Sequence, residues 1–156
     1  MMKTQSASAK AKKHVLLVDD DLEFSSWLAS CLEAQFNVQV TRASSGYTAM
    51  NELLDRFFSL VILDWDLAGM SGFQALKQVD QALELEDRLP LREVESRIPV
   101  VVLSGHEPSK IKSAKREKKH FRIHNVLSKR HGMEHLCEAI GALLNPEPNE
   151  NQKVAI

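Results

Sequence analysis

Five polar side chains that can bind a metal ion or carry a transferred group stand at the ends of short apolar runs. Asp19 and Asp20 follow the first run, Asp64 follows the third, Ser104 closes the fourth and Lys129 follows the fifth. Short, continuous apolar runs are typical of strands buried on both faces of a parallel sheet. Ligands of an open parallel sheet bind at the carboxyl ends of its strands. These carboxylates, the hydroxyl and the amine are therefore predicted to converge on one edge of a sheet.

Carboxylates brought this close together repel one another and require a cation. Hard oxygen ligands favour Mg²⁺, which keeps several waters and takes few ligands from the protein. A lone Asp-Asp pair is more often a helix N-cap beside a solvated neighbour, and Asp21 is predicted to have that capping role. The magnesium site is therefore predicted from the combination of strand ends, not from the aspartate run alone.

Five strand–helix units are predicted to position these groups. The predicted strands are residues 15–18, 37–41, 60–63, 100–103 and 123–127. Apolar residues recur at helical spacing in four stretches: Leu22, Leu28, Cys31, Leu32 and Phe36; Ala49, Met50, Leu53, Leu54 and Phe57; Phe73, Leu76, Val79 and Leu83; Met133, Leu136, Ile140, Leu143 and Leu144. Ser44 or Ser45 can cap the second helix, and a lysine-rich helix is predicted from about Pro108. This alternation implies an α/β fold with a parallel sheet covered on both faces.

The length of 156 residues suits one domain. Residues 14–144 are predicted to form it, with flexible tails at residues 1–13 and 145–156.

The net charge of −1 predicts no partner by itself. Cys31 and Cys137 match no metal or redox spacing and are interpreted as reduced core residues. No apolar run reaches the roughly 18 residues that span a bilayer, and we find no secretory signal, so a cytoplasmic protein without a membrane partner is expected.

Four motifs together resemble the receiver domain of two-component response regulators, over roughly residues 14–144. They are Leu17-Val18-Asp19-Asp20; Val61-Ile62-Leu63-Asp64, followed by Leu67, Met70 and Gly72; Ile98-Pro99-Val100-Val101-Val102-Leu103-Ser104-Gly105; and Leu127-Ser128-Lys129. The resemblance implies a flavodoxin-like, doubly wound sheet of five parallel strands in the order 2-1-3-4-5. It also implies a phosphoprotein of a phosphorelay, with a histidine kinase or histidine phosphotransfer protein as donor and an output protein, not identified by the sequence, as target.

The resemblance further implies a role for each matching residue. Asp64 resembles the phospho-acceptor, Asp20 the direct Mg²⁺ ligand, and Asp19 a residue that holds the ion mainly through water. The backbone carbonyl of Asp66 completes the metal site. Ser104 and Lys129 resemble the switch groups that contact the phosphoryl oxygens. The physical reason is general, because a carboxylate that attacks a phosphorylated histidine approaches an anion and needs a cation to offset the repulsion.

Three positions depart from the family pattern. Arg130 replaces the proline that usually follows the lysine, so a cis peptide bond is not expected there, and Ala68 replaces a proline in the loop after the acceptor. Val126 replaces an aromatic residue whose ring usually moves inward on activation. Either other elements carry the switch, or this face is not the switch. Asp66 adds a carboxylate near the acceptor, and Asp66 and His106 are predicted to tune dephosphorylation or metal affinity.

Two segments that are neighbours in the predicted fold carry opposite charge. Residues 80–95 hold six acids and two arginines, a net charge of −4, while residues 106–124 hold seven Lys or Arg and two Glu, a net charge of +5. They are interpreted as surfaces that partly neutralise each other or are solvated. Docking of an acidic partner on the basic segment is the alternative. Nucleic acid is not expected there, because few aromatic side chains are available for stacking.

Two functions compete with that of an active single-domain receiver, whose catalysis is limited to its own phosphorylation and dephosphorylation. The first is a pseudo-receiver, a phosphorylation-independent interaction module, which Val126 and Arg130 favour and the retained acceptor, metal and switch residues oppose. The second is a Mg²⁺-dependent phosphatase that passes through an aspartyl-phosphate on Asp64, with Asp66 as the second acid. Two observations count against the phosphatase: the Asp19-Asp20 pair precedes the nucleophile in the chain, and no cap domain is available. This is therefore the weaker alternative.

Overall fold

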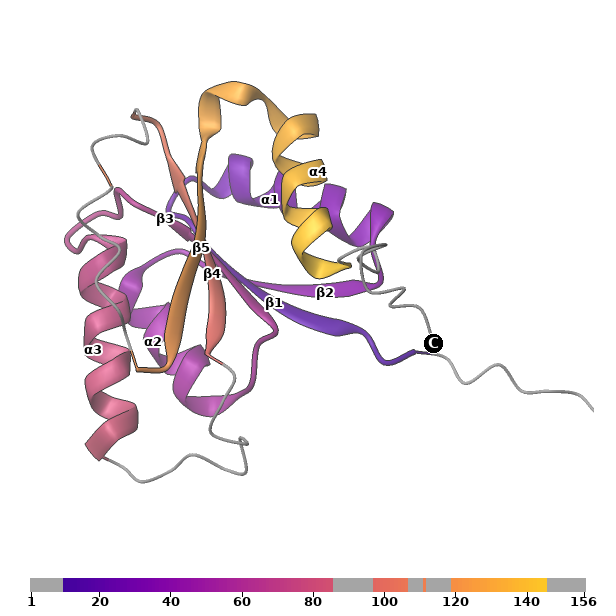
Figure 1. The fold of residues 1–156 in the computed structure, drawn as a ribbon. Helices are drawn as coiled ribbons and strands as arrows, with labels where there is room; N and C mark the ends of the chain where they lie inside the picture. Colours follow the sequence, from indigo (N-terminus) through magenta and orange to yellow (C-terminus); the bar gives the residue numbers. More distant parts are fainter. Residues whose placement is uncertain (1–9, 86–96, 107–110, 112–118, 146–156) are drawn as a thin grey trace, which may run out of the picture.

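The short apolar runs form a sheet whose central strands are buried on both faces. The structure is a computed structural model that describes residues 10–85, 97–106, 111 and 119–145 (Figure 1). The strands are β1 (Lys13–Val18), β2 (Val38–Ala43), β3 (Leu60–Asp64), β4 (Ile98–Ser104) and β5 (Phe121–Ser128). All pair in parallel, in the order β2-β1-β3-β4-β5. The predicted fold class and strand order are confirmed.

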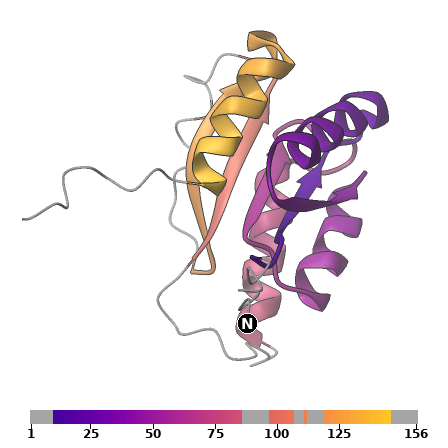
Figure 2. The same ribbon diagram turned by 90° about the vertical axis from the view of Figure 1, so that its right-hand side faces the viewer.

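Helices cover both faces of this sheet, as the two views in Figures 1 and 2 show. They are α1 (Leu22–Gln35), α2 (Gly46–Asp55), α3 (Gly72–Leu85) and α4 (Met133–Leu144), with a short 3₁₀ helix, η2 (Lys129–His131), before the last. Side chains alternate along a strand, so Leu16 and Val18 of β1 pack with residues of α2 and α3. Val15 and Leu17 pack in the second core with residues of α1 and α4.

Side-chain caps fix where the first two helices begin. The Asp21 carboxylate accepts a hydrogen bond from the Phe24 N–H at 3.0 Å, which confirms its predicted capping role. Ser45, and not Ser44, caps α2 by accepting from the Thr48 N–H at 3.1 Å. Each cap satisfies a backbone donor that the first helical turn leaves unpaired.

Several expectations about exposure and strand bounds were wrong. Phe57 lies beyond the end of α2 and is 56% exposed, and Leu22 at the start of α1 is 65% exposed, so neither belongs to the core. The second strand runs to Ala43, because it pairs with β1 along its whole length. The fifth strand was predicted over residues 123–127, whereas β5 runs from Phe121 to Ser128, and its side chains Arg122 and His124 are exposed. The strand lies at the edge of the sheet, where one side has no neighbouring strand.

Residues of the two oppositely charged segments meet where α3 passes the start of β5. The Asp80 carboxylate accepts hydrogen bonds from the backbone N–H groups of Lys119 and His120, and it lies 2.8 Å from Nδ1 of the buried His120. Lys119 Nζ lies 3.6 Å from Glu84. Burial alone raises the pKa of Asp80, but the hydrogen bonds from His120 and Lys119 outweigh it and lower that pKa. The predicted lysine-rich helix from about residue 108 lies outside the described residues, apart from Ile111.

Both cysteines are free, as predicted, with Cys137 buried in α4 and Cys31 partly exposed in α1. Burial raises the pKa of Cys137 to about 12, and contact with Cys31 adds to this, so the thiol stays protonated at neutral pH. None of the described helices is long and apolar enough to cross a membrane.

Candidate functional site

Three carboxylates meet at the carboxyl ends of β1 and β3. Asp19, Asp20 and Asp64 each offer one oxygen within 4.8 Å of the others. Asp19 is 1% exposed and Asp64 is 5% exposed, whereas Asp20 is open to solvent. Two of the three charges are therefore held away from water, and the third gives access to the site. We call these three residues the acidic cluster.

The parallel register of the sheet creates this meeting point. Val18 is paired with Leu63, so the residues that follow β1 lie beside the end of β3. Asp64 is paired with Leu103, which places Ser104 one residue further along β4 at the same edge. The Trp65 N–H donates to the Leu103 carbonyl at 2.8 Å, which holds the backbone just after Asp64 against β4.

Lys129 supplies the positive charge that faces the acidic cluster. Its ammonium donates to Asp19 Oδ2 at 2.7 Å and lies 3.4 Å from Asp64 Oδ2. It also lies 4.6 Å above the ring centroid of Phe24, an arrangement in which the ring face attracts a cation. The ammonium is thus held in place between two buried carboxylates and an aromatic ring.

The charge balance of the site favours a further cation. Burial and the negative charge of Asp19 raise the pKa of Asp64 to about 6, although Lys129 and the Asp66 N–H act in the opposite direction. Burial alone lowers the pKa of Lys129, but its hydrogen bond to Asp19 and the charges of Asp64 and Asp19 outweigh this and raise it. One ammonium therefore does not offset three carboxylates.

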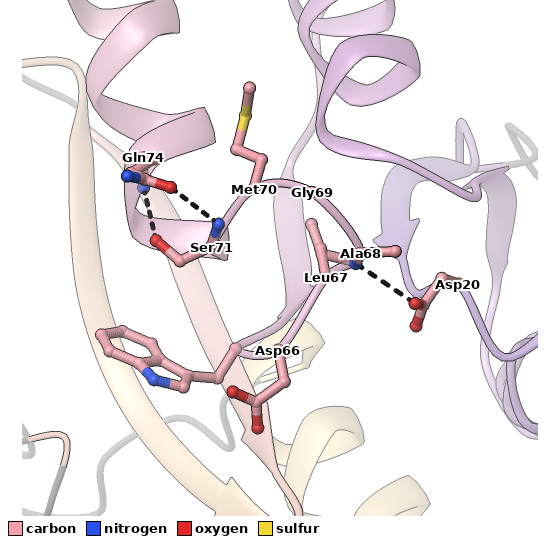
Figure 3. Close-up of a pocket in the computed structure, with 9 residues that line it drawn as sticks. Asp20, Asp66, Leu67, Ala68, Gly69, Met70, Ser71 and Gln74 are labelled. Carbon is pink, nitrogen blue, oxygen red and sulfur yellow. Dashed lines mark hydrogen bonds between the residues drawn. The ribbon is translucent and has the colours of Figure 1, made fainter.

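The loop between β3 and α3 forms the wall of the site. It encloses a pocket of about 460 Å³ that Asp20 also lines (Figure 3). The Ala68 N–H donates to Asp20 Oδ2 at 3.3 Å, which ties the loop to the exposed member of the acidic cluster. Ser71 and Gln74 exchange hydrogen bonds at the start of α3.

Gly72 lets α3 begin directly against the acceptor strand. A Cβ atom at this position would lie 2.5 Å from the Asp64 carbonyl oxygen and 2.8 Å from Cγ of Leu63. Neither neighbour can yield easily, because one is backbone and the other is fully buried. A glycine is therefore required for the helix to pack this closely on Asp64.

The remaining predicted site residues lie around the acidic cluster. Ser104 is fully buried, and its hydroxyl oxygen accepts from the His106 N–H at 3.0 Å. His106 Nδ1 lies 3.7 Å from Asp66 Oδ2, and both side chains are more than half exposed. The Asp66 N–H is 3.4 Å from Asp64 Oδ1. The sequence thus identified every side chain of the acidic cluster, but it gave no signal for Phe24 beneath Lys129.

A hard divalent cation fits this donor set. The acidic cluster offers only carboxylate oxygens, which suit Mg²⁺ better than metals that prefer nitrogen or sulfur. The exposed carboxylate of Asp20 leaves room for the waters that Mg²⁺ retains. Burial, and then the charge of Asp19, raise the pKa of Asp64, so a cation bound there would lower the cost of keeping Asp64 ionised.

Comparison with known proteins identifies the family of this fold. Residues 15–141 match the model of the response regulator receiver domain family. The two-component response regulator ORR3 of Oryza sativa subsp. indica is 33% identical over 101 residues, which cover 64% of this chain and 69% of that protein. The chain therefore belongs to the response regulator receiver domain family. It is a receiver domain of two-component signalling.

Solved structures of receiver domains share the fold. The Vibrio cholerae chemotaxis protein CheY4 has a TM-score of 0.66 and 20% sequence identity, and the match covers 85% of this chain and 99% of that one. A CheY-like receiver domain protein from Methanospirillum hungatei has a TM-score of 0.64 and 19% identity, with coverage of 86% and 94%. At this level of identity the likeness is evidence for the fold alone.

Proposed function

We propose that this receiver domain accepts a phosphoryl group on Asp64 in a Mg²⁺-dependent reaction and signals by binding another protein. The observation that supports this most directly is the Lys129 ammonium, 2.7 Å from Asp19 and 3.4 Å from Asp64 beside the third carboxylate, Asp20. A structural ion pair would need one carboxylate for one ammonium, whereas here three carboxylates are gathered. Such an excess of negative charge is costly unless a cation is bound when the site works.

In the proposed reaction a carboxylate oxygen of Asp64 attacks the phosphorus of a phosphorylated histidine on a kinase or phosphotransfer protein. The new O–P bond forms as the P–N bond breaks, and the imidazole leaves with the bonding electron pair. Asp64 must be ionised to attack, which its pKa of about 6 allows at neutral pH. Lys129 is placed to stabilise the negative charge that gathers on the phosphoryl oxygens.

The metal would be held by Asp20 directly, by Asp19 mainly through water, by Asp64 and by the backbone carbonyl of Asp66. When bound, Mg²⁺ supplies positive charge that offsets the repulsion between the carboxylate and the phosphoryl group. The protein contributes position, because Asp19 is fixed by the Asp21 N–H at 2.9 Å and Asp20 by the Ala68 N–H at 3.3 Å.

Transfer changes the partners available to the two switch groups. The phosphoryl group adds up to about two negative charges and three strong acceptor oxygens at Asp64. Lys129 then exchanges its contact with the Asp64 carboxylate for a phosphoryl oxygen, and the Ser104 hydroxyl turns from the His106 N–H toward the same group. These movements bias β4, β5 and their loops between two arrangements, and an output protein reads the difference.

Asp66 and His106 are placed to set how long the phosphoryl group lasts. Their side chains lie 3.7 Å apart, Asp66 follows Asp64 by two positions, and the His106 N–H donates to the Ser104 hydroxyl. We expect Asp66→Asn to change the lifetime of the aspartyl-phosphate or the Mg²⁺ affinity. An unchanged lifetime and an unchanged affinity would remove this tuning role.

Catalysis by the chain is limited, in this proposal, to its own phosphorylation and dephosphorylation. A cytoplasmic location remains a prediction from the sequence. The pseudo-receiver alternative is less well supported, because the acidic cluster and Lys129 keep a geometry that an inert interaction module does not require.

The test uses Mg²⁺ and beryllofluoride, which mimics an acyl phosphate on aspartate. Trp65, the residue after the acceptor, reports the change in fluorescence, and Trp27→Phe removes the emission of the exposed Trp27. A saturable, Mg²⁺-dependent change is expected. It should be lost in Asp64→Asn and kept in Asp55→Asn, whose side chain is 78% exposed at the last residue of α2. A folded protein that does not respond would favour the pseudo-receiver.

A further inference from the structure

A second group of metal-ligating side chains lies outside the acidic cluster, where η2 joins α4. The imidazole rings of His131 and His135 have centroids 5.2 Å apart and are tilted by 51°. Both line a pocket of about 460 Å³, together with Glu134 and Glu138. The two histidines lie on either side of the junction, His131 in η2 and His135 in the first turn of α4, and their rings line the same pocket, where they can share a metal ion.

The separation of the rings matches what a shared metal would require. Imidazole nitrogens bind Zn²⁺ at about 2.0 Å in tetrahedral geometry, which puts the centroids of two such rings roughly 5 Å apart. The rings of His131 and His135 are already at that separation. Among the described residues, neither imidazole is held by a hydrogen bond or an ion pair, so their nitrogens are free to bind.

The backbone of the junction holds the two rings together. Gly132, between η2 and α4, has a φ of +84°, in the left-handed region that favours glycine. A side chain at this position would be strained, and this turn is what brings His131 beside the first turn of α4. The backbone turn therefore places the two histidines close enough for their rings to be in contact.

The surrounding charges select the kind of metal. The N-terminus of α4 carries partial positive charge, and Arg130 precedes His131, so a cation held only by electrostatic attraction is disfavoured here. A metal that binds imidazole strongly can overcome this, with Glu134 and Glu138 offsetting its charge. Zn²⁺, Ni²⁺ and Cu²⁺ have that preference, whereas Mg²⁺ and Ca²⁺ prefer oxygen.

We propose that His131 and His135 form a two-histidine binding site for a transition-metal dication such as Zn²⁺, with water completing the coordination. The site is separate from the acidic cluster in its residues and in its metal preference. It lies in the same short 3₁₀ turn as Lys129, so an ion bound there would hold the backbone that carries this lysine.

The test is a calorimetric titration of the full chain with Zn²⁺ at pH 7.5, where unperturbed imidazoles are neutral. One Zn²⁺ site should weaken by about tenfold or more in His131→Gln and in His135→Gln. It should be unchanged in the matched control His124→Gln, which alters an exposed histidine of β5. Circular dichroism of each variant establishes that the fold is kept, which is expected because all three side chains are exposed.

Paramagnetic broadening by Cu²⁺ in ¹⁵N-labelled protein locates the ion independently of affinity. The proposal predicts that amides of residues 130–138 broaden first, also in Asp64→Asn. Equal Zn²⁺ affinity in wild type and both histidine variants would overturn the proposal. Broadening confined to the surroundings of Asp19, Asp20 and Asp64 would overturn it as well.

Discussion

Replacing Asp64 with Asn should make the metal-free protein more stable, although Asp64 is the proposed phospho-acceptor. The reason is the cost of keeping a buried carboxylate ionised next to Asp19. Burial and Asp19 raise the pKa of Asp64 from 3.8 to about 6. The folded protein therefore resists ionisation of this group, and the unfolded chain does not. Asn is nearly the same size and carries no charge, so it removes that cost.

The magnitude follows from the shift in pKa. A difference of about two units at about 1.4 kcal/mol each gives about 3 kcal/mol of destabilisation at a pH well above 6. This shift already includes the favourable contact with Lys129. Burying the polar amide of Asn costs roughly 1 kcal/mol, so we expect a net gain of roughly 2 kcal/mol in the free energy of unfolding. For a chain of this length, that gain corresponds to a rise in Tm of roughly 4–8 °C.

The pH dependence has a definite sign. As pH rises from about 4 to about 6, the unfolded chain releases the Asp64 proton before the folded protein does. The wild type therefore loses stability relative to Asp64→Asn across that window, and below about pH 4 the difference disappears.

Urea unfolding of both proteins in EDTA at pH 4, 5, 6 and 7.5 measures this directly. Asp55→Asn, an exposed carboxylate far from the site, should change stability by less than about 0.5 kcal/mol at every pH. The reasoning is refuted if Asp64→Asn is less stable than wild type at pH 7.5 without metal. It is also refuted if the gain is the same at pH 4 and pH 7.5.

Three further substitutions test packing and charges, two of them at the site and one, Asp80→Asn, where α3 passes the start of β5. Lys129→Met leaves the carboxylates of Asp19 and Asp64 without their ammonium partner, so it should lower the free energy of unfolding in EDTA by roughly 2 kcal/mol. Addition of Mg²⁺ should recover part of this loss. Gly72→Ala forces a Cβ against the acceptor backbone and should cost about 3 kcal/mol in urea unfolding, whereas Gly105→Ala, where nothing lies within 4 Å, should cost less than about 1 kcal/mol. Asp80→Asn should cost about 2 kcal/mol at pH 7. Because the pKa of Asp80 is lowered, its contribution is present above about pH 4 and is lost as pH falls, so a cost that does not decrease between pH 7 and pH 3 would contradict this assignment.

The acidic cluster could be predicted because parallel sheets obey a simple rule. Apolar runs buried on both faces identify the strands, and their carboxyl ends must lie at one edge. The residues that follow those runs then meet, whatever the details of the helices. Asp19, Asp64 and Lys129 were found in this way, and the structure places the ammonium of the lysine against both carboxylates.

Features that depend on irregular backbone could not be predicted. In β5 the pairing moves from Val100 with Ile123 to Val101 with Asn125, so one extra residue is inserted at His124. Such a bulge changes the face on which every later side chain of the strand lies. The alternation of apolar and polar residues therefore could not tell which way Val126 points. The structure packs it, partly buried, against the core on the α2 and α3 side.

Long-range contacts between unrelated elements were equally hidden. Phe24 lies beneath Lys129 although the two are more than one hundred positions apart, and no sequence pattern connects them. Phe57 suited the apolar face predicted for the second helix, but the helix ends at Asp55 and the ring is more than half exposed. The periodic pattern continued for one turn beyond the helix, because periodicity records spacing and does not mark where a helix ends.

The proposed phospho-acceptor is tested most directly by incubating the protein with a small phosphodonor, phosphoramidate, and measuring its intact mass. With Mg²⁺, wild type should gain one phosphoryl group, and hydroxylamine should remove it, as expected for an acyl phosphate on Asp64. No gain should occur in EDTA or in Asp64→Asn, while Asp55→Asn should behave as wild type. A Mg²⁺-dependent phosphoryl group on Asp64→Asn, or none on folded wild type, would contradict the proposed function.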